Sequence, residues 1–281
     1  ATRGVHAYLK RVSCSDRGKE YKKCRSLRSK RMAAKFYNLI DNNHMKRYIV
    51  FVMLLFSLDS LAQQLDVGWD YPIKPGTNEW KNLKSYEEQL NSYNIPSEII
   101  KKISTEELVK TCLAYPEWRM INAYSDRQAG LANVIGLFNG FHELLVRHDA
   151  AKELIKVYVK MDPLVIDRNW TSLQKGTYSF QFTCIEMLLS HGVIVRQLDE
   201  TDIRVLLNEA ISKYKSKKQM EDMCSLWYLS PTAGLCLSIL EKDGLLIKSN
   251  SDLQLFQQTF MTEDIEILER IIEESEKRIK L

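Results

Sequence analysis

The sequence predicts an all-α fold, an irregular or HEAT/armadillo-like array of about nine or ten short helices. Apolar residues recur three and four positions apart along most of the chain, and capping residues precede many of these segments. Strand evidence is limited to two three-residue runs, 193–195 and 245–247. The 281 residues, 45% of them hydrophobic, suffice for a substantial core. No repeat of fixed length stands out, so a superhelical stack and a compact irregular array both stay open.

The first elements of the predicted domain follow an extended arm. Residues 63–76 are aromatic and rich in proline, which is typical of a segment that lies on a domain rather than inside it. Thr77 or Asn78 can then cap a helix that continues to about residue 90. Ser104 and Glu107 have the spacing of a capping box and predict the start of another helix.

Later helix boundaries are predicted in the same way. Asp149 is expected to cap a helix, and Gly192 to end another with His191 in its last turn, where a cation suits the helix dipole. Ser230 and Pro231 read as an N-cap followed by a proline at the first helical position.

Glu186 is a carboxylate inside an otherwise apolar helical segment. Its neighbours at helical spacing include Ser179, Thr183 and Ser190, so we expect these residues to form the solvated face of that helix. The alternative is that Glu186 is a buried general acid.

Residues 45–62 have the order of a secretory signal peptide. Lys46 and Arg47 precede an apolar run that is too short for a bilayer span, and small residues stand before an expected cleavage between Ala62 and Gln63. We therefore expect a periplasmic or secreted protein with no permanent membrane span. Anchoring in the inner membrane by an uncleaved segment is the alternative.

Charge is divided unevenly along the chain. Residues 1–44 contain 12 basic and 3 acidic residues, and we interpret them as a basic extension, either upstream of the true start at Met45 or disordered. Residues 63–281, the predicted single domain, contain 26 basic and 32 acidic residues. A nucleic-acid partner is therefore not expected.

Motifs for cofactors, metals and disulfides are weak. The sequence contains no G-x-G-x-x-G, G-x-x-x-x-G-K-[ST] or G-x-S-x-G motif, so no cofactor is expected. His142 and His148 are six residues apart rather than the four of a zinc protease helix, so no metal site is expected. Cys224 and Cys236 would close the shortest disulfide loop, but Cys112, Cys184 and Cys236 occupy apolar helical positions, where cysteine usually packs as a small apolar side chain.

Trp69, Tyr71 and Trp80 are the candidate ligand-binding residues. Exposed aromatic rings can stack on sugar rings or on apolar groups of a partner. The alternative is that they attach the arm to the helices.

Residues 69–149 resemble a functionally uncharacterised family of exported helical proteins of Bacteroidetes and some Firmicutes. The resemblance rests on motifs such as Trp69-Asp70-Tyr71-Pro72, Ser104-Thr105-Glu106-Glu107-Leu108 and Phe138-Asn139-Gly140. It implies bacterial export and a helical fold, and it implies no activity.

Together these observations favour an exported, non-catalytic binding or interaction protein. Its partner would be an unidentified protein or glycan of the cell envelope. The alternative is an exported hydrolase whose carboxylates converge only in the folded chain.

Overall fold

A computed structural model describes residues 69–167, 169–245 and 251–280, and it confirms the all-α prediction. Within these residues ten helices have seven residues or more, and no strand occurs. The described residues belong to one compact unit, and residues 1–68, with the predicted basic extension and signal peptide, lie outside the described part.

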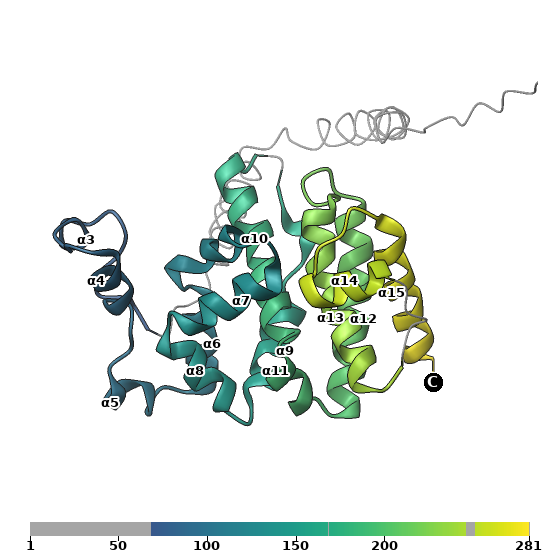
Figure 1. Ribbon diagram of the computed structural model, residues 1–281, viewed down its shortest axis with the longest axis horizontal. Coiled ribbons are helices and arrows are strands. Elements are labelled where there is room, and N and C mark those ends of the chain that lie inside the picture. The colour runs from purple at the N-terminus through teal and green to yellow at the C-terminus, as the bar shows by residue number, and fades with distance from the viewer. Residues whose placement is uncertain (1–68, 168, 246–250, 281) are drawn as a thin grey trace, which may run out of the picture. The chain divides into compact units, whose positions relative to one another are not determined.

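The N-terminal half of the unit begins with short helices and continues into longer ones (Figure 1). The elements are α3 (Asn78–Lys81), α4 (Tyr86–Asn91), α5 (Ser97–Ile100), α6 (Thr105–Leu113), the 3-10 helix η1 (Pro116–Ala123), α7 (Arg127–Gly136), α8 (Asn139–Val146) and α9 (Ala150–Lys160). Helix α6 packs against α8 and α9, and η1 packs against α7.

The C-terminal half contains the longest helices. Its elements are the 3-10 helix η2 (Pro163–Val165), α10 (Ser172–Leu189), α11 (Gly192–Gln197), α12 (Glu200–Lys218), α13 (Leu226–Lys242), α14 (Ser251–Thr259) and α15 (Ile265–Ile279). Helix α13 contacts α10, α12 and α15, and the last two lie beside it in Figure 1. Because most of its side chains are buried, α13 is the central helix of this half.

Several predicted caps are confirmed. The Ser104 side chain accepts a hydrogen bond from the Glu107 backbone, and the Glu107 carboxylate accepts one from the Ser104 backbone. Thr77 caps α3, and Asp149 occupies the N-cap position of α9. The boundaries at Thr77 and Ser104 depend on local hydrogen bonds, which explains why the sequence predicts them, whereas the Asp149 side chain makes no capping bond and accepts a hydrogen bond from the Thr105 hydroxyl instead.

The single helix expected from Thr77 to about residue 90 is wrong, because the segment forms α3 and α4. Ser85 caps α4 by accepting a hydrogen bond from the backbone of Glu88. The Glu88 carboxylate in turn accepts a hydrogen bond from the backbone of Lys84. The Ser85–Glu88 spacing is itself a capping signal, and it stops the first helix.

The run 193–195 is helical rather than extended, since it lies in α11. His191 is the N-cap of α11 and not part of the last turn of α10, so the predicted interaction of a cation with the helix dipole is wrong. Its Nδ1 accepts a hydrogen bond from the Val193 backbone, 3.3 Å away, and this bond needs an unprotonated nitrogen. The other expected run, 245–247, lies mostly outside the described residues.

Pro231 lies inside α13 rather than at its first position, because Ser225 is the N-cap. A proline has no N–H, so the Trp227 carbonyl four residues earlier has no intrahelical partner. The Arg127 guanidinium on α7 donates to that carbonyl from 2.7 Å. Arg127, 100 residues away in the sequence, thus supplies the hydrogen bond that the proline cannot donate. The sequence near Pro231 does not show this contact, so the predicted helix start at Ser230 is wrong.

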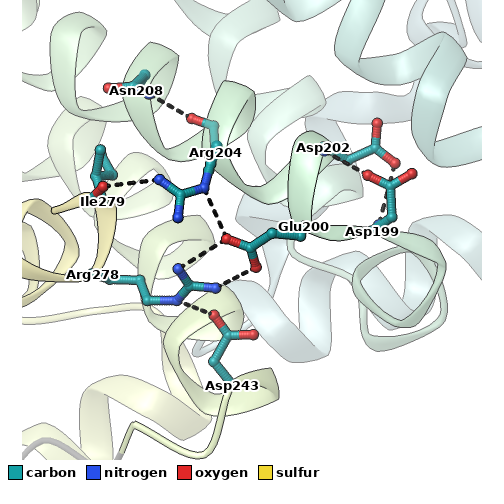
Figure 2. A network of polar contacts seen from close by, with 8 residues as sticks. All are labelled: Asp199, Glu200, Asp202, Arg204, Asn208, Asp243, Arg278 and Ile279. Atoms are coloured by element: carbon teal, nitrogen blue, oxygen red, sulfur yellow. Dashed lines mark hydrogen bonds and ion pairs between the residues drawn. The ribbon is translucent and has the colours of Figure 1, made fainter. Parts of the chain in front are cut away.

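Two features hold the C-terminal helices together. The ring of Phe260, between α14 and α15, lies so close to α13 that a Cβ atom on Gly234 would meet it at 2.6 Å. At the other end, Arg278 of α15 forms ion pairs with Glu200 of α12 and Asp243 at the end of α13, each at 2.6 Å (Figure 2).

Candidate functional site

A cluster of aromatic rings lies in the N-terminal half of the unit. Tyr115 stacks on Phe138 with ring centroids 4.8 Å apart. Most of the other ring pairs meet edge to face, and Trp80 stacks on Tyr93. Together these rings form the core of this half of the unit. The members of this aromatic cluster are Tyr71, Trp80, Tyr93, Tyr115, Trp118, Phe138 and Phe141.

The arm is attached to α6 through one residue, Thr111. The backbone N–H of Trp69 donates to the Thr111 hydroxyl from 2.8 Å, and the Tyr71 hydroxyl donates to the Thr111 carbonyl from 2.9 Å. Tyr71 is buried and its ring meets Tyr93 edge to face. Burial therefore raises the pKa of the Tyr71 phenol and keeps it protonated. In this structure Trp69 and Tyr71 anchor the arm.

Trp80 occupies a different position from the other two candidates. It is partly buried and stacks on Tyr93, with ring centroids 5.3 Å apart and planes 27° apart. The Tyr93 hydroxyl donates to Glu117 Oε1 from 3.3 Å. Trp80 is thus connected to a carboxylate through a single tyrosine.

Glu117 is a partly buried carboxylate without a basic partner. It lies in the first turn of η1, directly after Pro116. Over the described ranges no lysine, arginine or histidine forms an ion pair with it, and Tyr93 is its hydrogen-bond donor. The neighbouring basic residue Arg119 is exposed. The negative charge of Glu117 is therefore compensated by a phenol only.

Two exposed tyrosines complete this region. Tyr86 on α4 is 48% exposed, and Tyr124 at the end of η1 is 43% exposed. Partial burial raises the pKa of Tyr86, and the charges of Glu117 and Tyr124 act in the same direction. We call Trp80, Tyr86, Tyr93, Glu117 and Tyr124 the tyrosine face.

The sequence prediction identified only one member of the tyrosine face, Trp80. Trp69 and Tyr71 do not present exposed rings at this face. Tyr71 is buried, and Trp69 is partly buried and anchors the arm through its backbone N–H. The missed residues come from three segments, and none is part of a motif. The capping signal at Ser85 would have separated Tyr86 from the preceding helix, but no local signal pairs it with Glu117.

A second polar cluster is fully buried, and it overturns the solvated interpretation of Glu186. Glu186 on α10 and Lys217 on α12 form an ion pair with 0% of either side chain exposed. Lys217 Nζ lies 2.7 and 2.8 Å from the two carboxylate oxygens. Tyr158 and Thr232 each donate to Glu186 Oε1 from 2.9 Å. Ser179, Thr183 and Ser190, also expected in solvent, are buried.

The environment of this pair accounts for its charge state. Burial lowers the pKa of Lys217, and the Glu186 carboxylate counteracts this by favouring the charged amine. Burial and the same carboxylate raise the pKa of the Tyr158 phenol. Because Glu186, Lys217, Tyr158 and Thr232 are all bonded to one another and none of their side chains reaches solvent, the cluster joins helices rather than offering a reactive group.

Arg127 is another buried cation. Its guanidinium lies 4.3 Å from the centroid of the Trp227 ring and donates to the carbonyls of Trp227 and Phe260. Burial lowers its pKa to about 10, while the Glu186 charge acts in the opposite direction. Its role is to connect α7 with α13 and with the segment after α14.

The remaining candidates are separate from both clusters. His142 and His148 are exposed, and within the described ranges no group of three or more His, Cys, Asp or Glu side chains is arranged to hold a metal ion. Cys224 and Cys236 are not bonded to each other; Cys224 is exposed and Cys236 is buried. The predicted cleavage residues Ala62 and Gln63 lie outside the described part of the chain.

No family model matches the chain, and no curated protein or solved structure is significantly similar to it. The resemblance to an exported family therefore stays a prediction. Among the described residues, no individual helix has the length and apolar composition of a membrane span, although α7 and α8 together meet that criterion as a pair bent by 100°.

Proposed function

We propose that this chain is an exported, non-catalytic binding protein of the bacterial envelope and that the tyrosine face contacts its ligand. The export part of this proposal rests on the signal-peptide pattern of residues 45–62. The binding part rests on one observation, the exposure of two tyrosine rings, Tyr86 on α4 and Tyr124 at the end of η1.

Physical chemistry supports a binding role for these residues. Tyrosine offers a rigid apolar ring and a hydrogen-bonding hydroxyl, so ordering it in a complex costs little conformational entropy. The rings of Tyr93 and Trp80 are already fixed by stacking, so part of the face is preorganised. Tyr86 and Tyr124 make no ring contact among the described residues, and their exposed rings are the part of the face that a ligand would meet.

The test is a binding screen of the full chain against immobilised glycans and peptides of envelope proteins. We compare wild type with the double variant Tyr86→Ala/Tyr124→Ala. We expect wild-type signals to disappear in the variant while its Tm stays near wild type, because both side chains are exposed.

The matched control is Leu164→Ala/Leu173→Ala, which removes two apolar side chains that are 60% and 72% exposed in η2 and α10. This variant should keep every signal. Signals that survive the tyrosine double variant, or that disappear equally in the leucine variant, contradict the assignment of the ligand site to the tyrosine face.

A further inference from the structure

Residues 251–261, which comprise α14 and the two residues after it, form a strap that packs on α7 and α13. Within the strap the side chains of Leu253, Phe256 and Phe260 are buried, and the other residues are exposed or partly exposed. The rings of Phe256 and Phe260 stack, with centroids 5.8 Å apart and planes 23° apart. Three apolar side chains therefore supply the buried contact that holds the strap closed.

Phe260 anchors the strap, although its backbone conformation is unfavourable. Its φ of 53° is in the left-handed region, and no other residue except glycine has a positive φ in the described part of the chain. A residue with a Cβ atom adopts this conformation at a cost in free energy. The ring offsets that cost by filling the space above Gly234 of α13, where a Cβ atom would meet it at 2.6 Å. Closure of the strap therefore depends on the fit between one ring and one glycine.

Arg127 of α7 lies between the strap and α13, and it is only 3% exposed. Its guanidinium donates to the Trp227 carbonyl of α13 from 2.7 Å and lies 4.3 Å from the centroid of the Trp227 ring. The contact with the strap is weaker, because the Phe260 carbonyl accepts from a distance of 3.4 Å, beyond the usual hydrogen-bond range. Arg127 would therefore keep its stronger contacts if the strap moved away.

Hydration of Arg127 favours such a movement. The Nε atom of Arg127 is buried without a hydrogen-bond partner, and no carboxylate of the described residues forms an ion pair with this guanidinium. A buried cation without an anionic partner is stabilised when water reaches it. This gain, together with release of the backbone strain at Phe260, offsets part of the cost of exposing the phenylalanine rings.

The strap is also separable from the helices around it. Within the described structure, residues 254–261 make one hydrogen bond to α7, α10, α12 or α13, the bond from Arg127, and no ion pair. Helix α14 has nine residues, too few to be stable without tertiary contacts. The next helix, α15, is fixed by the ion pairs of Arg278 with Glu200 and Asp243. The strap can therefore open while α15 stays in place.

We propose that residues 251–261 open as a unit while α13 and α15 stay folded, and that the strap thereby controls access from solvent to the Arg127 guanidinium. Phe260 sets the balance between the closed and the open form, because its ring holds the strap on Gly234. The open form presents a guanidinium without an anionic partner among the described residues. This inference does not depend on the proposed function, because it involves no residue of the tyrosine face.

The first test is hydrogen–deuterium exchange of the full chain, measured by mass spectrometry of peptides from the strap, α13 and α15. After correction for intrinsic rates, we expect the strap amides to exchange about tenfold or more faster than those of α15. Low urea concentrations should change strap exchange little, because a local opening exposes little surface. Strap exchange at the rate and urea dependence of α15 overturns the proposal, and this comparison needs only the wild-type chain.

Gly234→Ala should shift the balance towards the open form. The added methyl group would collide with the Phe260 ring, whereas alanine suits the interior of α13 better than glycine does. We expect strap exchange to become about tenfold faster, with α15 exchange unchanged. The matched control is Gly176→Ala in α10, where no atom lies within 4 Å of the added group, and it should exchange like wild type. An equal acceleration in α15 contradicts an independent opening.

Access to Arg127 is measured by its rate of modification with phenylglyoxal, an arginine reagent, and the modified peptide is identified by mass spectrometry. Arg119 is exposed and serves as the internal reference. Relative to Arg119, Arg127 should react slowly in wild type and in Gly176→Ala, and about tenfold faster in Gly234→Ala. If Gly234→Ala accelerates strap exchange without accelerating the modification of Arg127, the strap does not control access and the proposal is wrong.

Discussion

Removing the amine of the buried pair should destabilise the protein more than any surface charge change. In Lys217→Met the Glu186 carboxylate keeps its hydrogen bonds from Tyr158 and Thr232 but loses its only cationic partner in the described structure, and it stays fully buried. Breaking a buried ion pair in this way costs about 3–5 kcal/mol, because one charge is left uncompensated. For a unit of this size the loss corresponds to a decrease in Tm of about 10 °C.

A double-mutant cycle separates the ion pair from packing effects. Glu186→Leu should cost as much as Lys217→Met, since it leaves a buried ammonium with only neutral acceptors. The double variant Glu186→Leu/Lys217→Met removes both charges and leaves two hydroxyl groups without a partner, at about 1–3 kcal/mol each. It should therefore cost about as much as one single variant and much less than the two together, with a coupling energy of about 3 kcal/mol.

The measurement is urea unfolding followed by circular dichroism, with the midpoints compared at a constant m value. Lys218→Met is the matched control, because the neighbouring Lys218 pairs with Glu269 at the surface, where the side chains are 42% and 38% exposed. That variant should lose at most about 1 kcal/mol. Additive costs of Glu186→Leu and Lys217→Met, within about 0.5 kcal/mol, would refute the reasoning.

Three further predictions concern packing, charge and pH. Gly130→Ala should destabilise strongly, because a Cβ there would collide with backbone atoms of η1, whereas Gly136→Ala, with open space around it, should stabilise by up to about 1 kcal/mol in thermal unfolding. Asp243→Asn should lower Tm by breaking the Arg278 network of Figure 2, and high salt should reduce the difference. Burial, together with a neighbouring arginine, lowers the pKa of His191, so the unfolded state binds the proton more readily. Its contribution to stability is therefore complete above about pH 6.5 and decreases as the pH falls through the lowered pKa. His191→Asn keeps a capping acceptor and should remove that part of the pH dependence of the unfolding free energy; an unchanged pH profile contradicts the assignment.

The sequence alone determined the fold class and those helix boundaries that depend on neighbouring residues. The capping box of Ser104 and Glu107 and the cap at Thr77 were predictable, because each involves residues within one helical turn. The apolar positions of α12 were equally clear, because their periodicity matches the helix.

The candidate site was predictable only in part. Trp80 could be selected as an aromatic residue near the arm, but its role depends on Tyr93 and Glu117, which no spacing rule connects to it. Trp69 and Tyr71 had the same composition signal, and tertiary contacts with Thr111 give them the anchoring role instead.

Only the tertiary structure decided which polar residues are buried. Glu186 has serine and threonine neighbours at helical spacing, a pattern typical of a solvated face, yet Lys217 from a helix 31 residues away neutralises it inside the core. Pro231 looked like a helix start, and Arg127 lets the helix begin earlier by binding the carbonyl that the proline leaves free. In both cases a charged side chain distant in sequence stabilises a buried polar group: Lys217 pairs with the Glu186 carboxylate, and Arg127 binds the Trp227 carbonyl. Burying such a group is costly unless a partner compensates for the lost contact with water, and the local sequence does not show where that partner comes from.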